Sequence, residues 1–173
     1  MRFSGSARRL FWPLSITLLV VDCTTKRVVE AAVPVVEVPH HLVDDIVRVT
    51  LEYNKGGALS THLGPYERWI LIGLTLAVLF FLARSYTRMA RAGALAVAGL
   101  ALVTGGAVGN LLDRILSTRG VTDFIDIGIG AQRFYVFNGA DIGVSVGTAL
   151  LAYTMWRSDG EGVEKLIAKV DGA

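Results

Sequence analysis

Aspartates beside long apolar runs are the residues of this sequence best placed to do chemistry. Five have this setting, and periodicity alone leaves all five open: Asp22, Asp113, Asp123, Asp126 and Asp141. Two carboxyl groups a few ångströms apart share a proton, because both cannot readily ionise. The ionised member takes a proton from water, which attacks a carbonyl carbon, and the protonated member donates to the substrate oxygen. The residue types therefore predict hydrolysis by a pair of aspartates.

Other catalytic groups are less well arranged. The histidines, His40, His41 and His62, fall in one segment without the His-Glu-x-x-His pattern of zinc peptidases. Cys23 is the single cysteine, so no internal disulfide forms, and no histidine lies near it in sequence to activate the thiol. No spacing of carboxylates argues for a metal ion. We expect neither a metal nor another cofactor.

The elements that must position these acids are membrane helices. Of the 173 residues, 53% are hydrophobic and 18% are charged, whereas soluble domains carry roughly 25% charged residues. A membrane helix needs roughly 20 mostly apolar residues. Four segments meet this requirement, at about 10–29, 66–82, 92–112 and 138–156. The predicted fold is an all-α polytopic membrane protein, with residues 1–173 forming a single domain of four transmembrane helices.

The loops predict the orientation. The short 84–91 connection holds three arginines and no acid, and positive charge in short loops marks the cytoplasmic side. Both termini are therefore expected in the cytoplasm, with the loops at about 30–65 and 114–137 outside. The net charge of +2, without a basic block, predicts no nucleic-acid partner.

The first outer loop contains strand signals. Residues 46–53 are rich in β-branched side chains and partly alternate, which predicts a strand. Residues 33–38, around Pro34, are a weaker candidate for an edge strand. We therefore expect a small extracytoplasmic β-sheet at the membrane surface.

Two polar pairs on the first and third helices have both structural and functional interpretations. Asp22 and Lys26 are four residues apart, as are Asn110 and Arg114, so each pair shares a helix face. The first pair fits a structural ion pair as well as a functional one. Asn110 can hydrogen-bond between helices, and Arg114 can snorkel or bind lipid headgroups.

The polar residues around the fourth helix are harder to explain as structure. Asn138 and Asp141 are three apart on one face, and Asp141 has no basic residue at a spacing of three or four. A carboxylate at that depth needs a partner or a raised pKa. Asp123 and Asp126 lie in the connection before this helix, and we interpret Asp126 as a solvated loop acid.

Glycines recur every four residues on the last two apolar segments. Gly139, Gly143 and Gly147 form one row, and Gly105 and Gly109 form another. Small residues at this spacing let helix backbones approach closely in lipid. We expect these rows to bring the third and fourth helices together.

The chain is similar to a known family in five ordered motifs: VDCTTK, YNKGGALS, GGAVGNLLDR, VTDFID and FNGAD. Together they span about residues 10–156 and resemble lipoprotein signal peptidase, also called signal peptidase II. The resemblance implies a bacterial inner-membrane aspartic endopeptidase that cuts prolipoproteins before the diacylglyceryl-modified cysteine. It implies Asp123 and Asp141 as the catalytic pair.

The same resemblance implies supporting residues, namely Asp22, Lys26, Asn54, Gly56, Asn110, Arg114 and Asn138. It further implies lipid-modified prolipoproteins and membrane lipids as partners, and binding of the antibiotic globomycin in the same pocket. We expect a monomer. The chain departs from the usual family pattern at Cys23, Leu59 and Tyr135, none of which is an implied catalytic acid.

The sequence allows three other interpretations. A lipoprotein precursor ending its signal at Cys23 is disfavoured, because Asp22 stands where cleavage needs a small residue. A transporter or channel would place polar residues along a whole path, yet the inner halves of the helices are almost bare of charge. A lipid-binding scaffold would use Arg114 and the glycines, and a cleavage assay separates it from an enzyme.

Overall fold

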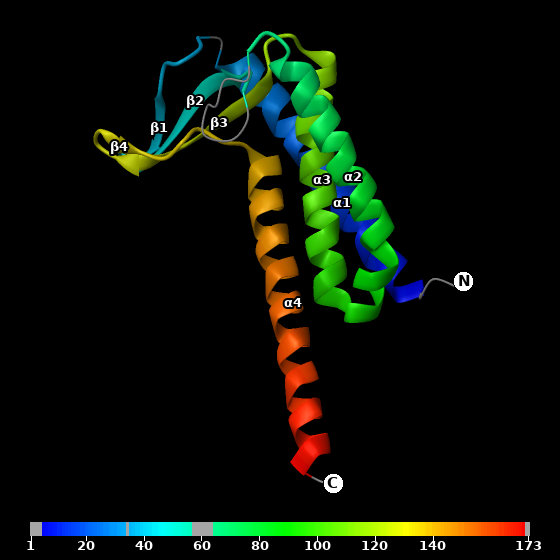
Figure 1. The fold of residues 1–173 in the computed structure, drawn as a ribbon. Helices are drawn as coiled ribbons and strands as arrows, with labels where there is room; N and C mark the ends of the chain where they lie inside the picture. The colour runs from blue at the N-terminus through cyan, green and yellow to red at the C-terminus, as the bar shows by residue number, and fades with distance from the viewer. Residues whose placement is uncertain (1–4, 34, 57–63, 172–173) are drawn as a thin grey trace.

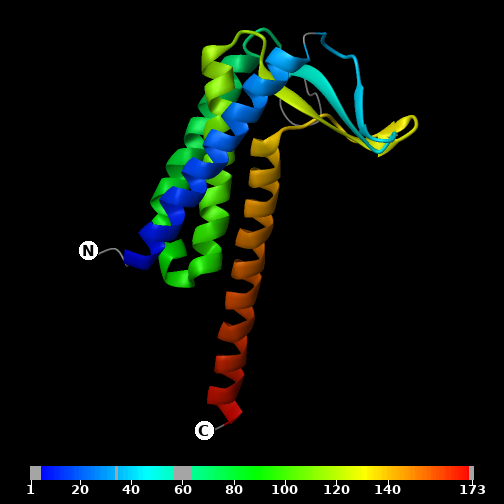
Figure 2. The same cartoon turned by 180° about the vertical axis from the view of Figure 1, so that it is seen from behind.

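Four helices form a bundle, and a small sheet projects sideways from one end of it (Figure 1). The computed structural model describes residues 5–33, 35–56 and 64–171. The helices of this part are α1 (Gly5–Ala32), α2 (Glu67–Ala92), α3 (Ala94–Leu116) and α4 (Gly139–Asp171). The strands are β1 (His40–Val43), β2 (Val47–Asn54), β3 (Val121–Ile129) and β4 (Gln132–Arg133). Figure 2 shows from behind that the C-terminal part of α4 extends beyond the other helices.

The helices are found where the apolar segments predicted them, but α2 and α4 extend furthest beyond their predicted C-terminal ends. α2 runs on to Ala92, so the predicted 84–91 connection is helical, and Gly93 alone, with φ 116°, joins α2 to α3. The extension contains alanine, arginine and methionine, which favour helix. α4 likewise continues past Trp156 to Asp171.

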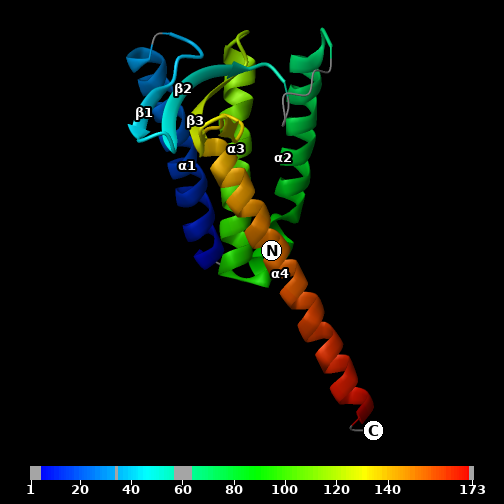
Figure 3. The same ribbon diagram turned by 90° about the vertical axis from the view of Figure 1, so that its left-hand side faces the viewer.

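α3 is the central helix of the bundle. α1, α2 and α4 all pack on it, and Figure 3 shows α1 and α2 on opposite sides of α3. Gly99 and Gly147 form the α3–α4 contact: a Cβ on Gly147 would lie 2.6 Å from the Gly99 carbonyl oxygen. The predicted glycine rows also serve α1, because Gly105 abuts Ser15 and Gly143 abuts Leu18.

Two of the described helices, α2 and α3, are long and apolar enough by composition to cross a membrane. α1 carries Asp22, Lys26 and Arg27 within its length, and α4 begins with a polar turn. Four transmembrane spans therefore stay a prediction.

The strands form one antiparallel sheet in the order β1-β2-β3-β4. The strand predicted at 46–53 is confirmed as β2. The edge strand predicted at 33–38 is wrong, because the described residues there form no strand and Glu37 has a left-handed φ of 62°. The connection predicted around Asp123 and Asp126 is instead strand β3, paired with β2 through Glu52–Asp123 and Arg48–Asp126.

Candidate active site

The start of α4 positions Asp141 and Asn138 together. The Asn138 side-chain oxygen accepts from the Asp141 backbone N–H at 3.0 Å, and Asp141 accepts from the Asn138 N–H at 3.1 Å. This reciprocal arrangement is a capping box, which satisfies two backbone donors at a helix start. The Asp141 carboxylate thus lies in the first turn, where the helix dipole favours negative charge.

Asn138 also joins the two sequence-predicted acids. Its side-chain nitrogen donates to Asp123 Oδ1 at 2.6 Å and to Asn110 Oδ1 at 3.1 Å. Asn110 in turn donates to Asp141 Oδ1 at 2.8 Å. Asn138 is fully buried. A short chain of amides therefore connects the carboxylates of β3 and α4, and holds both in fixed orientations.

The pairing of β2 with β3 brings Asn54 to the same place. Asn54 lies opposite Val121 in the sheet, and its side-chain nitrogen donates to Asp123 Oδ2 at 3.1 Å. Gly120 permits the close approach: it has φ 107°, and a Cβ there would lie 2.4 Å from the Asn54 carbonyl oxygen. Both oxygens of Asp123 consequently accept hydrogen bonds from neutral amides.

Arg114 links the third helix to the segment after β2. Its guanidinium donates to the carbonyls of Asn110 at 3.2 Å and Gly56 at 3.3 Å. Its Nε is buried, and no described residue is its hydrogen-bond partner. One donor of the cation is therefore available to a group that enters the site.

Lys26 is the cation at the centre of the network. Its ammonium lies 2.7 Å from Asp22, 2.9 Å from Asp113 and 2.9 Å from Asn110 Oδ1. The structure confirms the predicted Asp22–Lys26 ion pair, and both side chains are almost completely buried. Asp22 also accepts from the Ala140 N–H at 2.8 Å, satisfying a donor of the first turn of α4.

Burial shapes the acid–base behaviour of Asp123. Only 3% of the residue is exposed, and this burial raises the pKa of its carboxyl from 3.8 to about 7. The negative charge of Asp141 raises the pKa further, while the hydrogen bonds from Asn54 and Asn138 oppose the shift. Asp123 thus keeps its proton to a higher pH than a solvated aspartate does.

The two acids face one cavity of about 300 Å³. Asn54, Asn110 and Arg114 also line it, so most of the sequence-predicted polar residues border one space. The apolar part of the wall comes from Val121, Val144 and the segment 134–137. Tyr135, at which the chain departs from the usual pattern, belongs to this wall, whereas Leu59 lies outside the described residues.

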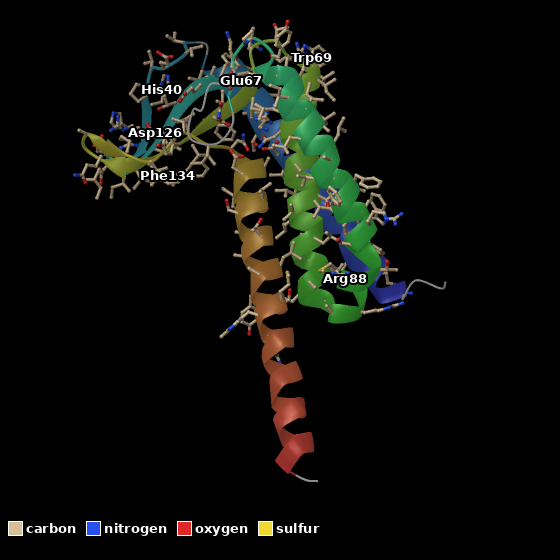
Figure 4. All side chains as sticks on the ribbon, in the orientation of Figure 1. His40, Glu67, Trp69, Arg88, Asp126 and Phe134 are labelled. Carbon is tan, nitrogen blue, oxygen red and sulfur yellow. The ribbon has the colours of Figure 1, made fainter. Side chains whose placement is uncertain are left out.

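The expectation that Asp126 is a solvated acid is wrong. Only 6% of Asp126 is exposed. Its carboxylate accepts from Arg133 Nε at 2.7 Å and from the Thr50 hydroxyl at 3.0 Å. The strand pairing buries it, and Figure 4 shows Asp126 on the sheet. Asp126 therefore serves as the buried partner of a cation on the neighbouring strand β4.

Two contributors were missed or undervalued in the sequence. Asp113 holds Lys26 and also accepts from the Thr122 N–H at 3.3 Å, directly before Asp123. Arg68 of α2 donates to the carbonyls of Arg114 and Ile115 at 2.6 and 2.9 Å, and so caps α3. The ten-residue motif GGAVGNLLDR, which contains Asp113, hinted at its role. No local signal marks Arg68, because its acceptors lie far away in sequence.

Residues 143–147 match the Gly-x-Ser-x-Gly pattern of serine hydrolases, with Ser145 at its centre. These residues lie inside α4 and not on a strand-to-helix turn, which that nucleophile requires. Ser145 lines the cavity, but no described histidine does. Among the described residues, no group of three or more acids, histidines or cysteines is arranged to hold a metal ion.

These features define a helical membrane protein with a buried site built around two carboxyl groups. The sequence profile of the signal peptidase II family matches residues 14–157. A lipoprotein signal peptidase of Hydrogenovibrio crunogenus is 36% identical over 156 residues, which cover 87% of this chain and 86% of the relative. One from Geobacter metallireducens is 33% identical over 153 residues, covering 87% and 93%. The chain belongs to the signal peptidase II family, and it is a peptidase.

Solved structures support the fold. A bacterial membrane enzyme determined by the in meso method at 2.3 Å resolution superposes with a TM-score of 0.78 at 22% identity, covering 92% of each chain. A second, determined at 1.9 Å resolution, gives a TM-score of 0.71 at 25% identity, covering 88% of this chain and 94% of the other. The bundle with its sheet is thus an arrangement shared with membrane enzymes.

Proposed function

We propose that this protein removes signal peptides from diacylglyceryl-modified prolipoproteins, cleaving before the lipidated cysteine with Asp123 and Asp141 as its catalytic acids. The observation that carries the proposal is the amide bridge between the two. Asn138 donates to Asp123 at 2.6 Å, and it caps the same helix turn that holds Asp141. Family membership supports the reaction, and this pair supports its aspartic type.

In the proposed mechanism, Asp141 is the ionised member and Asp123 the protonated one. Asp141 takes a proton from water in the cavity, and the water oxygen bonds to the scissile carbonyl carbon. Asp123 gives its proton to the carbonyl oxygen. As the C–N bond breaks, Asp141 gives the proton it took from water to the leaving amine, and the hydroxyl proton of the intermediate returns to Asp123. The raised pKa of Asp123 supports its role as the donor.

The other polar residues have positioning roles in this proposal. Asn54, Asn110 and Asn138 keep the carboxyl oxygens oriented, which lowers the cost of assembling the reacting groups. Arg114 offers its unpartnered Nε to the substrate or its phosphate-bearing surroundings. Asp22 and Lys26 connect α1 to the start of α4 and to the C-terminal part of α3. Gly56 contributes its carbonyl to Arg114.

The proposed location is the bacterial inner membrane, with four spans, both termini in the cytoplasm and the acid pair near the outer face. The sheet supports a position of the acid pair near one membrane face, because exposed strand edges belong outside the hydrocarbon. A substrate anchored by acyl chains would then present its scissile bond at the level of the cavity. Prolipoproteins and membrane lipids are the proposed partners, and the proposed active form is a monomer.

The decisive experiment is cleavage of a diacylglyceryl-modified prolipoprotein in liposomes. Wild type, Asp123→Asn and Asp141→Asn are compared, with Asp126→Asn as the matched control from the same strand. Each dyad variant is expected to lose about 10²-fold or more of its activity, while the control keeps its activity within about tenfold. Circular dichroism checks that each variant is folded.

The outcomes separate the alternatives. Full activity in either dyad variant would overturn the assignment of these acids and move the chemistry to Asp22 or Asp113. An inactive, folded wild type would favour a binding or transport protein.

A further inference from the structure

A second cavity lies in the helical bundle at the end away from the sheet. It has a volume of about 700 Å³ and opens between α1 and α2 over the surface of α3. Its apolar lining comes from all three helices, namely Phe11, Trp12, Leu79, Leu82 and Leu100. α1 and α2 both pack on α3, and they stand on opposite sides of it in Figure 3. The groove is the space that this arrangement leaves.

The walls of the groove are firmly held. The rings of Phe11 on α1 and Tyr86 on α2 meet edge to face, with centroids 5.2 Å apart. Phe11 and Leu100 belong to the buried core of the bundle. Trp12 is 58% exposed at the mouth, and a tryptophan in this position is typical of the membrane–water interface. The groove is therefore a formed apolar surface that faces lipid.

One edge of the groove is cationic. Arg84 lines it, and Arg88 and Arg91 follow at spacings of four and seven on the same face of α2. All three are exposed, and Figure 4 shows Arg88 near the end of the bundle opposite the sheet. No acid occurs between residues 68 and 112. Within the described residues, none of the three arginines makes an ion pair or hydrogen bond.

We propose that an anionic phospholipid binds here, with an acyl chain in the groove and its phosphate on Arg84 and Arg88. An arginine at the end of a membrane helix, without a partner among the described residues, is free to bind phosphate, which its planar guanidinium contacts through paired hydrogen bonds. Basic surfaces between membrane helices are sites of anionic headgroups. The apolar lining of the groove lies next to the row of arginines, so a single lipid can place its acyl chain against the lining and its phosphate on the arginines. This site is separate from the acid pair and does not rest on its catalytic role.

The test uses the full chain, purified and delipidated in a neutral detergent. Native mass spectrometry measures retention of dioleoyl phosphatidylglycerol against dioleoyl phosphatidylcholine, which has the same chains but no net charge. Wild type is expected to bind the anionic lipid at least about tenfold more tightly, because the choline cation of the control lipid offsets the attraction between its phosphate and the arginines. The midpoint of thermal unfolding should rise only with that lipid.

Two kinds of variant probe the two halves of the site. The double substitution Arg84→Gln with Arg88→Gln should abolish the preference for the anionic lipid. Ala83→Trp, which keeps the charge but fills the groove, should weaken binding of both lipids, because Ala83 lines the cavity. The matched controls are Arg27→Gln, an exposed arginine of α1 near the sheet, and Ala77→Trp, an exposed position on another face of α2.

Several results would overturn the proposal. Equal affinity of wild type for the two lipids would do so, as would an unchanged preference in the double arginine variant. Glycerol phosphate that binds as tightly as the whole lipid would remove the role of the groove. Loss of binding in Ala77→Trp as large as in Ala83→Trp would show a general response to bulk on α2.

Discussion

Asp123 and Asp126 lie three residues apart on β3, and both are buried, yet they have opposite surroundings. Asp126 accepts from the guanidinium of Arg133 at 2.7 Å and from Thr50. Among the described residues, Asp123 accepts from the neutral amides of Asn54 and Asn138, and the negative charge of Asp141 raises its pKa. The side chains leave opposite faces of the strand, as the two-residue period requires. A buried acid with a cation beside it supports the fold, whereas one with amides and a second acid is suited to proton transfer.

The cations show the same division. Arg133 contacts Asp126 directly and ties β4 to β3. Lys26 lies behind the acid pair: it contacts Asp22 and Asp113, and reaches the pair only through Asn110. The positive charge of Lys26 thus lies near Asp123 and Asp141, but among the described residues neither of these two acids forms a direct ion pair with a cation. The predictions that follow test this difference.

Lys26→Met should have the largest effect on stability. The substitution leaves the carboxylates of Asp22 and Asp113 buried without their cation, which typically costs about 3–5 kcal/mol. The free energy of unfolding in detergent, measured by denaturant titration, should fall by that order. A change below about 1 kcal/mol would mean that the three groups are not buried together. The conservative variant Lys26→Arg keeps the positive charge and changes only the shape of the side chain, so it separates the two contributions.

The pH dependence of stability should report on Asp123. Its pKa rises from the ordinary 3.8 of an aspartate to about 7 in the fold, so the folded state binds the proton more tightly. The stabilisation from this proton is complete below about pH 4 and is lost as the pH rises through about 7, with an upper limit of a few kcal/mol. Thermal midpoints from pH 4 to 8 measure it. The decline of the thermal midpoint with rising pH should shrink in Asp123→Asn and persist in Asp126→Asn. Equal slopes in the two variants would contradict the difference between these two aspartates.

Arg133→Gln should have a moderate effect. The substitution removes the cation beside Asp126, and leaving a hydrogen-bonded charge without its partner costs about 1–3 kcal/mol. Prolipoprotein cleavage should stay within a few-fold of wild type, because Arg133 does not line the cavity. Paired measurements of unfolding and cleavage check this. A loss of cleavage with stability unchanged would move Arg133 into the catalytic machinery.

Asn54→Ala should have the smallest of these effects on acid–base behaviour. The hydrogen bond from Asn54 lowers the pKa of Asp123, so its removal should move the alkaline limb of kcat/KM upward. The wild-type limb is expected near pH 7, and the shift should be below about one pH unit, because one hydrogen bond contributes about 1 kcal/mol. A limb that moves downward or stays in place would show that Asn54 does not act on Asp123.

Much of the architecture follows from local patterns. Long apolar runs predicted the four helices, β-branched residues predicted β2, and a spacing of four predicted the Asp22–Lys26 pair, which the structure confirms. These features depend on neighbours within a few residues, and a sequence displays such neighbours directly. The ordered motifs likewise indicated the family before any coordinates.

Only the tertiary structure distinguished Asp123 from Asp126 by their surroundings. β3 was not predicted, because it becomes a strand by pairing with β2, about 70 residues earlier in the chain. That pairing brings Asn54 to one acid and buries the other beside Arg133 and Thr50. Local sequence determined which elements form, while contacts between distant segments decided the charge and solvation around each acid, and so the chemistry each can perform.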